Sequence, residues 1–195
     1  IDLSGYDDGL FLISGVSWTP DGSHAVVHVQ DRIQTWLDVL HVPAGGGAPV
    51  KIMRETTRAW VTSPGPFEYL EDGSFLMFSE RDGFQHLYHY RPDGTLIRQV
   101  TSGPWECRRL LHVDEARGVL FFTGTTASHV GNDLYRINLD GSDLTRLTHE
   151  PGSHSVRLNP SATMFIDAWS SLNHPTRVAL RNTDDGGLVR WLDTN

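Results

Sequence analysis

The sequence predicts an all-β fold: a fragment of a β-propeller with about four blades, each a sheet of four short antiparallel strands. Three observations support this prediction. Short apolar segments recur at a nearly constant spacing, similar turn residues recur at the same phase, and no stretch holds a 3.6-residue apolar period for three turns. A β-sandwich also has short strands and turn signals, but it does not require a fixed repeat. The chain is expected to form one partial propeller domain over residues 1–195, with blades at about 15–53, 59–103, 105–150 and 153–192.

Each repeat opens with a short apolar strand that runs into a tight turn. The turns contain Pro-Asp-Gly, Asp-Gly or a comparable polar sequence, and Gly supplies the positive φ that hairpin turns need. The first strands are expected at 16–18, 67–70, 110–113 and 155–158. The second strands follow these turns, at 25–27, 75–78, 119–122 and 164–166. Their spacing of roughly 45–50 residues is typical of propeller blades.

The second half of each repeat has an alternating strand, another turn and a fourth strand. The third strands are expected at 36–39, 86–90, 133–137 and 176–180. Gly-rich or Asp-Gly turns follow at 45–47, 93–94, 140–141 and 185–186. The fourth strands are expected at 50–52, 96–100, 144–147 and 188–191.

Charge and composition exclude several classes of partner. The formal net charge of −8 argues against a nucleic-acid or anionic-membrane partner. The single cysteine, Cys107, excludes an internal disulfide.

Ile1 is not a residue that removal of an initiator Met normally exposes, so we expect the chain to be cut from a longer one with further blades upstream.

No catalytic, metal-binding or cofactor-binding constellation is predicted. The sequence lacks the Gly-x-Ser-x-Gly elbow of a serine hydrolase, and the Gly152-Ser153-His154-Ser155 segment is interpreted as a loop that feeds a strand. His24 and His28 would share one strand face but lie about 13 Å apart, too far to bind one ion. His86 and His89 would face opposite sides of a strand.

Several segments resemble one known family. Ser79–Tyr88 resembles a Ser-Glu-x-Asp-Gly-aromatic-x-His-aliphatic-Tyr stretch in the N-terminal propeller of dipeptidyl peptidase IV proteins, of the prolyl oligopeptidase family of serine peptidases. Four more segments resemble that family in the same order, at 96–106, 134–141, 146–148 and 167–171. The resemblance covers about residues 12–195.

The resemblance implies an eight-bladed propeller, of which this chain would be half, the later blades. It also implies a C-terminal α/β-hydrolase domain that holds a Ser–Asp–His triad and is absent from this chain. The parent would release N-terminal dipeptides from peptide substrates, in the periplasm or outside the cell. This chain would be a non-catalytic part that gates substrate access and scaffolds the active site, with upstream blades and the hydrolase domain as its partners. The alternative is a propeller that binds a protein partner and has no linked hydrolase domain.

The resemblance also directs attention to one loop. In the family, the segment after a Trp-Val pair presents an aromatic residue and an Arg to the substrate, whereas here Trp60-Val61 precedes a shorter segment without Arg. A first strand is expected near Trp60, and the loop 61–68 after it, stiffened by two prolines, would open at the channel mouth. The predicted substrate-channel residues are Trp60, Val61, Phe67 and Glu68. The uncovered sheet faces of a cut ring also predict self-association of the fragment.

Overall fold

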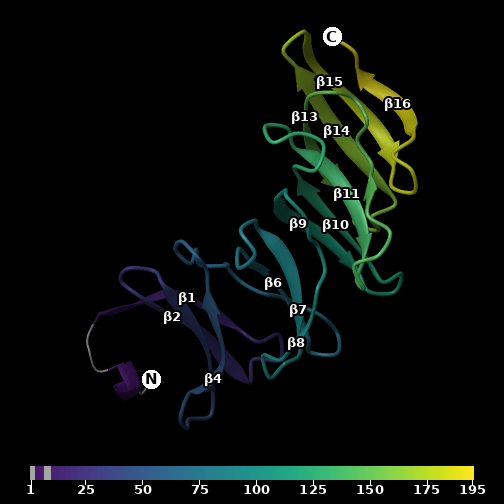
Figure 1. Cartoon of the computed structure of the whole chain (residues 1–195). Coiled ribbons are helices and arrows are strands. Elements are labelled where there is room, and N and C mark those ends of the chain that lie inside the picture. The colour runs from purple at the N-terminus through teal and green to yellow at the C-terminus, as the bar shows by residue number, and fades with distance from the viewer. Residues whose placement is uncertain (1–2, 7–9) are drawn as a thin grey trace. The chain divides into compact units, whose positions relative to one another are not determined.

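The structure is a computed structural model that describes residues 3–6 and 10–195. It divides into two compact units, Ile1–Gln99 and Val100–Asn195, and each unit contains two four-stranded antiparallel sheets (Figure 1). The only helix among the described residues is the 3₁₀ turn η1 (Ser4–Tyr6), and none of them forms a helix long and apolar enough to span a membrane. The all-β prediction of four four-stranded sheets is therefore confirmed.

The first unit holds the first and second sheets, and in each the strands pair in chain order. The first sheet consists of β1 (Phe11–Trp18), β2 (His24–Asp31), β3 (Trp36–Pro43) and β4 (Val50–Thr56). The second sheet consists of β5 (Glu68–Tyr69), β6 (Phe75–Ser79), β7 (His86–Tyr90) and β8 (Leu96–Gln99). Each sheet is an antiparallel meander, as expected of a propeller blade.

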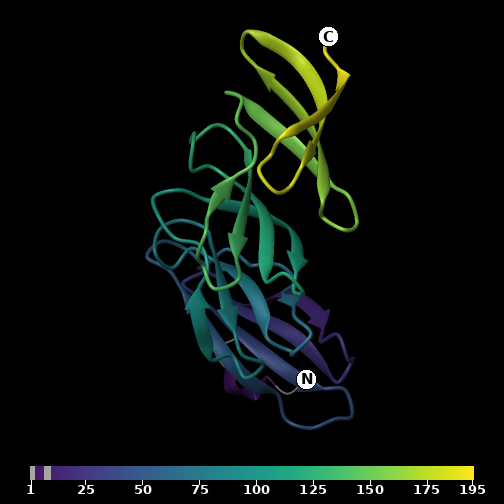
Figure 2. The same cartoon turned by 90° about the vertical axis from the view of Figure 1, so that its right-hand side faces the viewer.

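The second unit holds the third and fourth sheets, which have the same chain-order pairing (Figure 2). The third sheet consists of β9 (Cys107–Asp114), β10 (Val119–Gly124), β11 (Asp133–Asn138) and β12 (Thr145–Arg146). The fourth sheet consists of β13 (Ser153–Leu158), β14 (Met164–Ser171), β15 (His174–Asn182) and β16 (Leu188–Asp193).

Each unit is held together by an apolar core between its two sheets. In the first unit, the side chains that meet there are Val26, Leu37, Val39, Val61, Phe67, Phe75, Met77, Tyr88 and Tyr90. In the second unit they are Phe121, Leu134, Leu147, Ala162 and Phe165. Alternate residues of one strand face opposite sides of its sheet, so each sheet also presents a second face away from this core.

One predicted strand is absent. No strand begins near Trp60; residues 57–67 have no regular structure, and the first strand of the second sheet is the two-residue β5. Pro64 and Pro66 lack the N–H that a ladder needs, so this segment cannot pair as a continuous strand. The prediction of a first strand at Trp60 is therefore wrong, whereas the short strand expected at 67–70 is present as β5.

Two turn glycines bring neighbouring sheets into close contact. Gly94, in the turn between β7 and β8, has a φ of 82°, and a Cβ there would overlap the backbone carbonyl of Ile52 on β4. Gly186, in the turn between β15 and β16, has a φ of 76° and would overlap the backbone of Leu147, just after β12. In both units, therefore, the turn before the last strand of a sheet packs against the last strand of the preceding sheet or the residue directly after it. The two backbones approach so closely there that the turn residue must be glycine.

Candidate functional site

The segment between β4 and β5, residues 57–67, contains three of the four predicted channel residues, and we call it the strap. Val61 anchors its middle: the Val61 N–H donates to the Gln34 carbonyl over 2.6 Å, and the Gln30 side-chain amide donates to the Val61 carbonyl. The Val61 side chain is 1% exposed and belongs to the first-unit core. Backbone and side chain together therefore hold this residue against the first sheet.

Phe67 anchors the end of the strap. Its ring stacks on Phe75 with a centroid distance of 4.6 Å and an interplanar angle of 6°. Its ring centroid also lies 5.3 Å from that of the His28 ring. Because Phe67 is buried in the core, replacing it would disturb packing before it changed any contact with a ligand.

Trp60 and Glu68 are the two exposed members of the predicted set. Trp60 is 63% exposed although its backbone is restrained, because the Thr57 hydroxyl donates to its carbonyl over 2.9 Å and the next residue is anchored. Glu68 is exposed at the start of β5. The four residues thus form two buried anchors and two exposed groups, and their position along a substrate channel stays a prediction.

A small pocket of about 270 Å³ lies beside Trp60. It combines an aromatic ring with a cation and a carboxylate, from Trp60, Arg58 and Glu80. Such a surface can stack on an apolar or proline side chain and pair with peptide charges at the same time. The sequence interpretation sought an Arg after the Trp-Val pair and missed Arg58, which precedes it; Glu80 was quoted only as part of a family segment.

The Ser79–Tyr88 segment, which supplies Glu80 to this pocket, also has a structural role. The Ser79 hydroxyl donates over 2.8 Å to the carboxylate of Glu55, which is 3% exposed. The Arg81 guanidinium also pairs with Glu55, donates to the Tyr90 hydroxyl, and lies 4.4 Å over the Tyr88 ring. This network ties the second sheet to β4 of the first and fixes the backbone that carries Glu80.

The Gly152–Ser155 segment belongs to a buried charge network rather than to a nucleophile elbow. His154, on β13, is 2% exposed, and its Nδ1 lies 2.8 Å from the Asp167 carboxylate. Its Nε2 lies 3.0 Å from the Glu150 carbonyl oxygen, and Arg181 pairs with both Asp167 and the Glu150 side chain. Both partners of the imidazole are acceptors, and the hydrogen bonds to them raise the pKa of His154 above its ordinary value, which favours the doubly protonated ring.

The histidines of the first unit lie in separate surroundings, except that the rings of His24 and His41 lie 5.5 Å apart. His28 is buried beside Phe67, and His89 lies 2.8 Å from the Ser74 hydroxyl. Among residues 3–6 and 10–195, no group of three or more His, Cys, Asp or Glu side chains is arranged to hold a metal ion.

The chain matches one protein family over most of its length. The family described as the dipeptidyl peptidase IV N-terminal region matches residues 4–176. Human dipeptidyl peptidase 8 is 27% identical over 89% of this chain, and dipeptidyl peptidase 4 of Arthroderma otae is 23% identical over 100% of it. The chain spans about a quarter of the length of these relatives, 25% and 26% respectively.

Solved structures confirm the fold. Dipeptidyl peptidase 4 of Porphyromonas gingivalis superposes with a TM-score of 0.81 and 25% identity, covering 95% of this chain and 26% of that protein. A putative dipeptidyl aminopeptidase IV from Bacteroides ovatus superposes with a TM-score of 0.82 and 20% identity, covering 95% and 29%. The resemblance inferred from Ser79–Tyr88 and the later segments is thereby confirmed.

Proposed function

Because this chain belongs to the family of dipeptidyl peptidase IV N-terminal regions, we propose that it is the non-catalytic propeller part of a longer serine exopeptidase. In that parent protein, a hydrolase domain outside these 195 residues supplies the nucleophilic Ser, and acyl transfer to this Ser releases N-terminal dipeptides. The propeller part scaffolds the active site and restricts which peptides reach it. The curated relatives named above are dipeptidyl peptidases, which supports this reading over a propeller without a hydrolase domain.

The observation that carries the gating role is the strap. Val61 and Phe67 hold it at two buried points, and between these anchors and β4 the chain presents an exposed Trp60. A large aromatic side chain on a restrained backbone gives a peptide a fixed contact at a small entropic cost. Such a contact acts on substrate binding and makes no contribution specific to the transition state.

The proposal is tested with Trp60→Ala in the parent protein. Loss of one aromatic contact, about 0.5–1.5 kcal/mol, should raise KM for dipeptidyl substrates about 2- to 13-fold and leave kcat within about twofold. Trp60 is exposed, so the variant should keep the melting temperature of the wild type.

Trp18→Ala is the matched control. Trp18 is also exposed, at 59%, but it pairs with Ala25 at the end of the first sheet opposite to the strap. Its replacement should change neither KM nor kcat. Wild-type kinetics in the Trp60 variant, or equal effects of both substitutions, would refute the gating role.

A further inference from the structure

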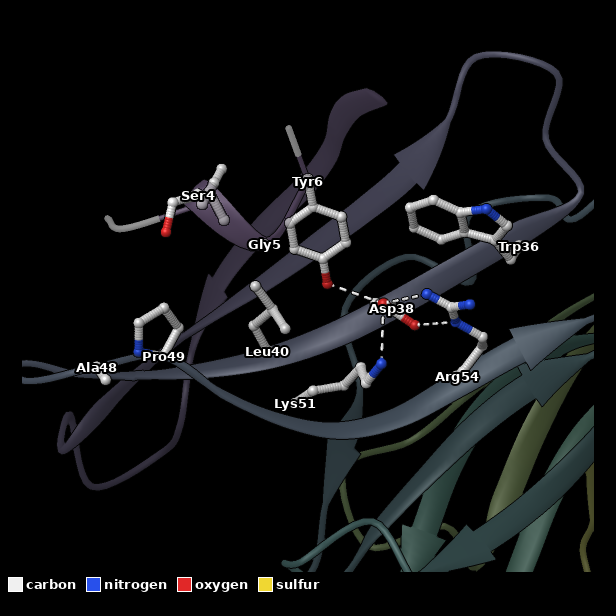
Figure 3. A pocket seen from close by; sticks show the side chains of 11 residues that line it. Ser4, Gly5, Tyr6, Trp36, Asp38, Leu40, Ala48, Pro49, Lys51 and Arg54 are labelled. Atoms are coloured by element: carbon white, nitrogen blue, oxygen red, sulfur yellow. Dashed lines mark hydrogen bonds and ion pairs between the residues drawn. The ribbon is translucent and has the colours of Figure 1, made fainter. Parts of the chain in front are cut away.

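The first sheet carries polar side chains on both of its faces. On the face away from the second sheet, a charged recess of about 650 Å³ has the buried Asp38 at its base (Figure 3). Arg54 donates to this carboxylate over 2.6 and 2.7 Å, and the Tyr6 hydroxyl donates over 2.8 Å. The polar groups at the base of the recess therefore satisfy one another. The face towards the second sheet differs, because it carries a histidine pair that is only partly satisfied.

His24 and His41 meet on that face, at one end of the first sheet. His24 is the first residue of β2, and His41 lies close to the end of β3. In the register of these strands His41 pairs with Val26, two residues from His24, so the two histidines are diagonal neighbours. Their ring centroids lie 5.5 Å apart. Two imidazoles that bind one tetrahedral Zn²⁺ ion at the usual bond length have centroids about 5 Å apart, so the rings already have nearly the spacing of a shared ion.

Hydrogen bonds in the turn between β1 and β2 assign the tautomer of His24. The Ser23 hydroxyl donates its one hydrogen to Asp21 over 2.8 Å, so its oxygen accepts from Nδ1 of His24, which is 2.8 Å away. The Thr19 hydroxyl also donates to Asp21, over 2.7 Å. With its hydrogen on Nδ1, the neutral His24 ring has its lone pair on Nε2. Histidines that bind metals are typically held in this way, because a hydrogen bond at one ring nitrogen orients the other towards the ion.

His41 has a ring nitrogen that lacks a partner. Its Nε2 atom is buried and makes no hydrogen bond to any of the residues that the structure describes. Buried polar atoms are nearly always paired, since an unpaired one loses its hydration without compensation. A metal ion bound to Nε2 of His24 would give this atom a partner across the two strands.

The charge around the pair favours a cation. The Asp21 carboxylate lies close enough to act electrostatically on His24 and on Tyr69 of the second sheet. Burial and this carboxylate raise the pKa of Tyr69 to about 12, and its hydroxyl is also buried without a hydrogen bond to a described residue. Asp21 accepts only from Thr19 and Ser23 among the described residues, so no Lys or Arg balances its charge there.

We propose that His24 and His41 bind one divalent transition-metal ion through their Nε2 atoms. Imidazole nitrogen suits Zn²⁺, Ni²⁺ and Cu²⁺, whereas Mg²⁺ and Ca²⁺ prefer oxygen ligands. Among residues 3–6 and 10–195, no third His, Cys, Asp or Glu side chain is arranged to join the pair, so water completes the coordination and the ion is exchangeable. The site lies within this chain and does not depend on the proposed function.

The number of ligating imidazoles is the first test, made on the 195-residue chain. Cu²⁺ binds nitrogen ligands more tightly than Zn²⁺ does, so less than one equivalent of Cu²⁺ should occupy this site first. Pulsed electron paramagnetic resonance should then show two coordinated imidazoles in the wild type and one in His41→Gln. A single imidazole in the wild type would mean adventitious binding to a surface histidine and would overturn the proposal.

Zinc affinity, measured by competition with a zinc-binding dye, compares matched histidines. His24→Gln and His41→Gln should each weaken Zn²⁺ binding by about tenfold or more, since loss of a ligand costs at least as much as loss of its hydrogen-bond partner. His129→Gln removes an exposed histidine of the second unit and should leave the affinity unchanged. Equal affinities in the wild type and all the variants would contradict the site.

Ser23→Ala tests the orientation of His24. Without the hydroxyl that accepts from Nδ1, the ring can adopt its other tautomer, and Zn²⁺ should bind about tenfold more weakly. Ser161→Ala, in the corresponding turn of the fourth sheet between β13 and β14, is the matched control and should bind as the wild type does. Unchanged binding in Ser23→Ala would contradict the ligand geometry proposed for His24.

A measurement on the wild-type chain covers the case in which a variant fails to fold. Zn²⁺ should shift the NMR ring signals of His24 and His41 before those of any other histidine, and it should raise the melting temperature. Mg²⁺, which prefers oxygen ligands, should do neither. Shifts that appear first at another histidine would overturn the assignment of the site.

Discussion

His28 is a buried side chain whose two ring nitrogens have no hydrogen-bond partner among residues 3–6 and 10–195. It fits because Gly15, its cross-strand partner on β1, leaves room for the imidazole, and the Phe67 ring packs beside it. Burial lowers the pKa of His28 to about 4, since the charged ring would lose its hydration without gaining a partner. The unfolded chain therefore binds this proton at a higher pH than the folded chain does.

The first unit should accordingly lose stability in acid. The contribution of His28 to the free energy of unfolding is present above its unfolded pKa of about 6.5. It is lost as the pH falls from there towards 4. Between pH 7 and pH 5 the loss should be about 1–2 kcal/mol, measured by denaturant unfolding. His28→Leu should remove this part of the pH dependence, whereas His129→Leu, at an exposed position, should keep it. An unchanged acid slope in the His28 variant would contradict the assignment.

His154 has the opposite response. Burial would lower its pKa, but hydrogen bonds to the Asp167 carboxylate and the Glu150 carbonyl, with the nearby charges, raise it above the ordinary value. With the ring charged, the network balances three carboxylates against three cations, namely Asp133, Glu150 and Asp167 with Arg146, His154 and Arg181. Removing the proton would leave an acceptor facing a carboxylate or a carbonyl.

The second unit should therefore lose stability in base. The contribution of His154 to the free energy of unfolding is fully present below about pH 6.5. It is lost as the pH rises through the raised pKa of the folded state. Nitrogen-15 NMR at pH 6 should show both ring nitrogens protonated. His154→Leu should destabilise the second unit by about 3 kcal/mol, as expected when one partner of a buried charge pair is removed. A neutral tautomer at pH 6 would disprove the imidazolium assignment.

At the scale of the elements, the turn before the last strand of a sheet needs glycine for a reason that its sequence pattern does not reveal. Asp-Gly occurs in several turns of this chain, but only some of these glycines touch a neighbouring sheet. Gly94 lies against the backbone of Ile52, whereas Gly22 faces open space. The same residue type is therefore needed for close packing in one turn and for its φ alone in the other.

Alanine substitutions should separate the two requirements. Gly22→Ala should cost about 1 kcal/mol, the strain of a positive φ. Gly94→Ala should cost at least twice as much, because its Cβ would overlap a backbone carbonyl that cannot move without shifting β4. Thermal unfolding of the two variants measures the difference, and equal melting temperatures would show that the sheets can separate at this turn without loss.

For the molecule as a whole, the exposed apolar side chains of the last strand, β16, favour self-association of the chain. Every residue of β16 is exposed, including Leu188 at 47%, Val189 at 54% and Leu192 at 44%. A strand with unpaired backbone groups and exposed apolar side chains favours association with another sheet. We expect the isolated chain to self-associate with increasing concentration.

Light scattering over a concentration series tests this expectation. Val189→Glu should weaken the association by at least tenfold, since a charge would be buried in the contact. A strictly monomeric wild-type chain at high concentration, or unchanged association of the variant, would contradict a role for β16.

The sequence alone was sufficient for the repeat and the fold. Short apolar runs such as Phe75–Ser79, followed by turns with glycine, are local patterns, and local patterns specify strands and hairpins. The family resemblance of Ser79–Tyr88 could also be recognised, because it depends on contiguous residues. The strap was located by its Trp-Val pair, although the strand expected near Trp60 was not formed.

Tertiary structure decided what these residues do. It showed that Val61 and Phe67 are anchors while Trp60 is exposed, that Arg58 and Glu80 share a pocket, and that both ring nitrogens of His154 face acceptors. It also showed that Gly94 is closely packed whereas Gly46 is open. Each of these properties depends on contacts between sheets, which join residues far apart in the chain. A sequence pattern determines which face of a strand a residue occupies, but the partner across the interface, and with it burial and charge state, is set by how the sheets stack.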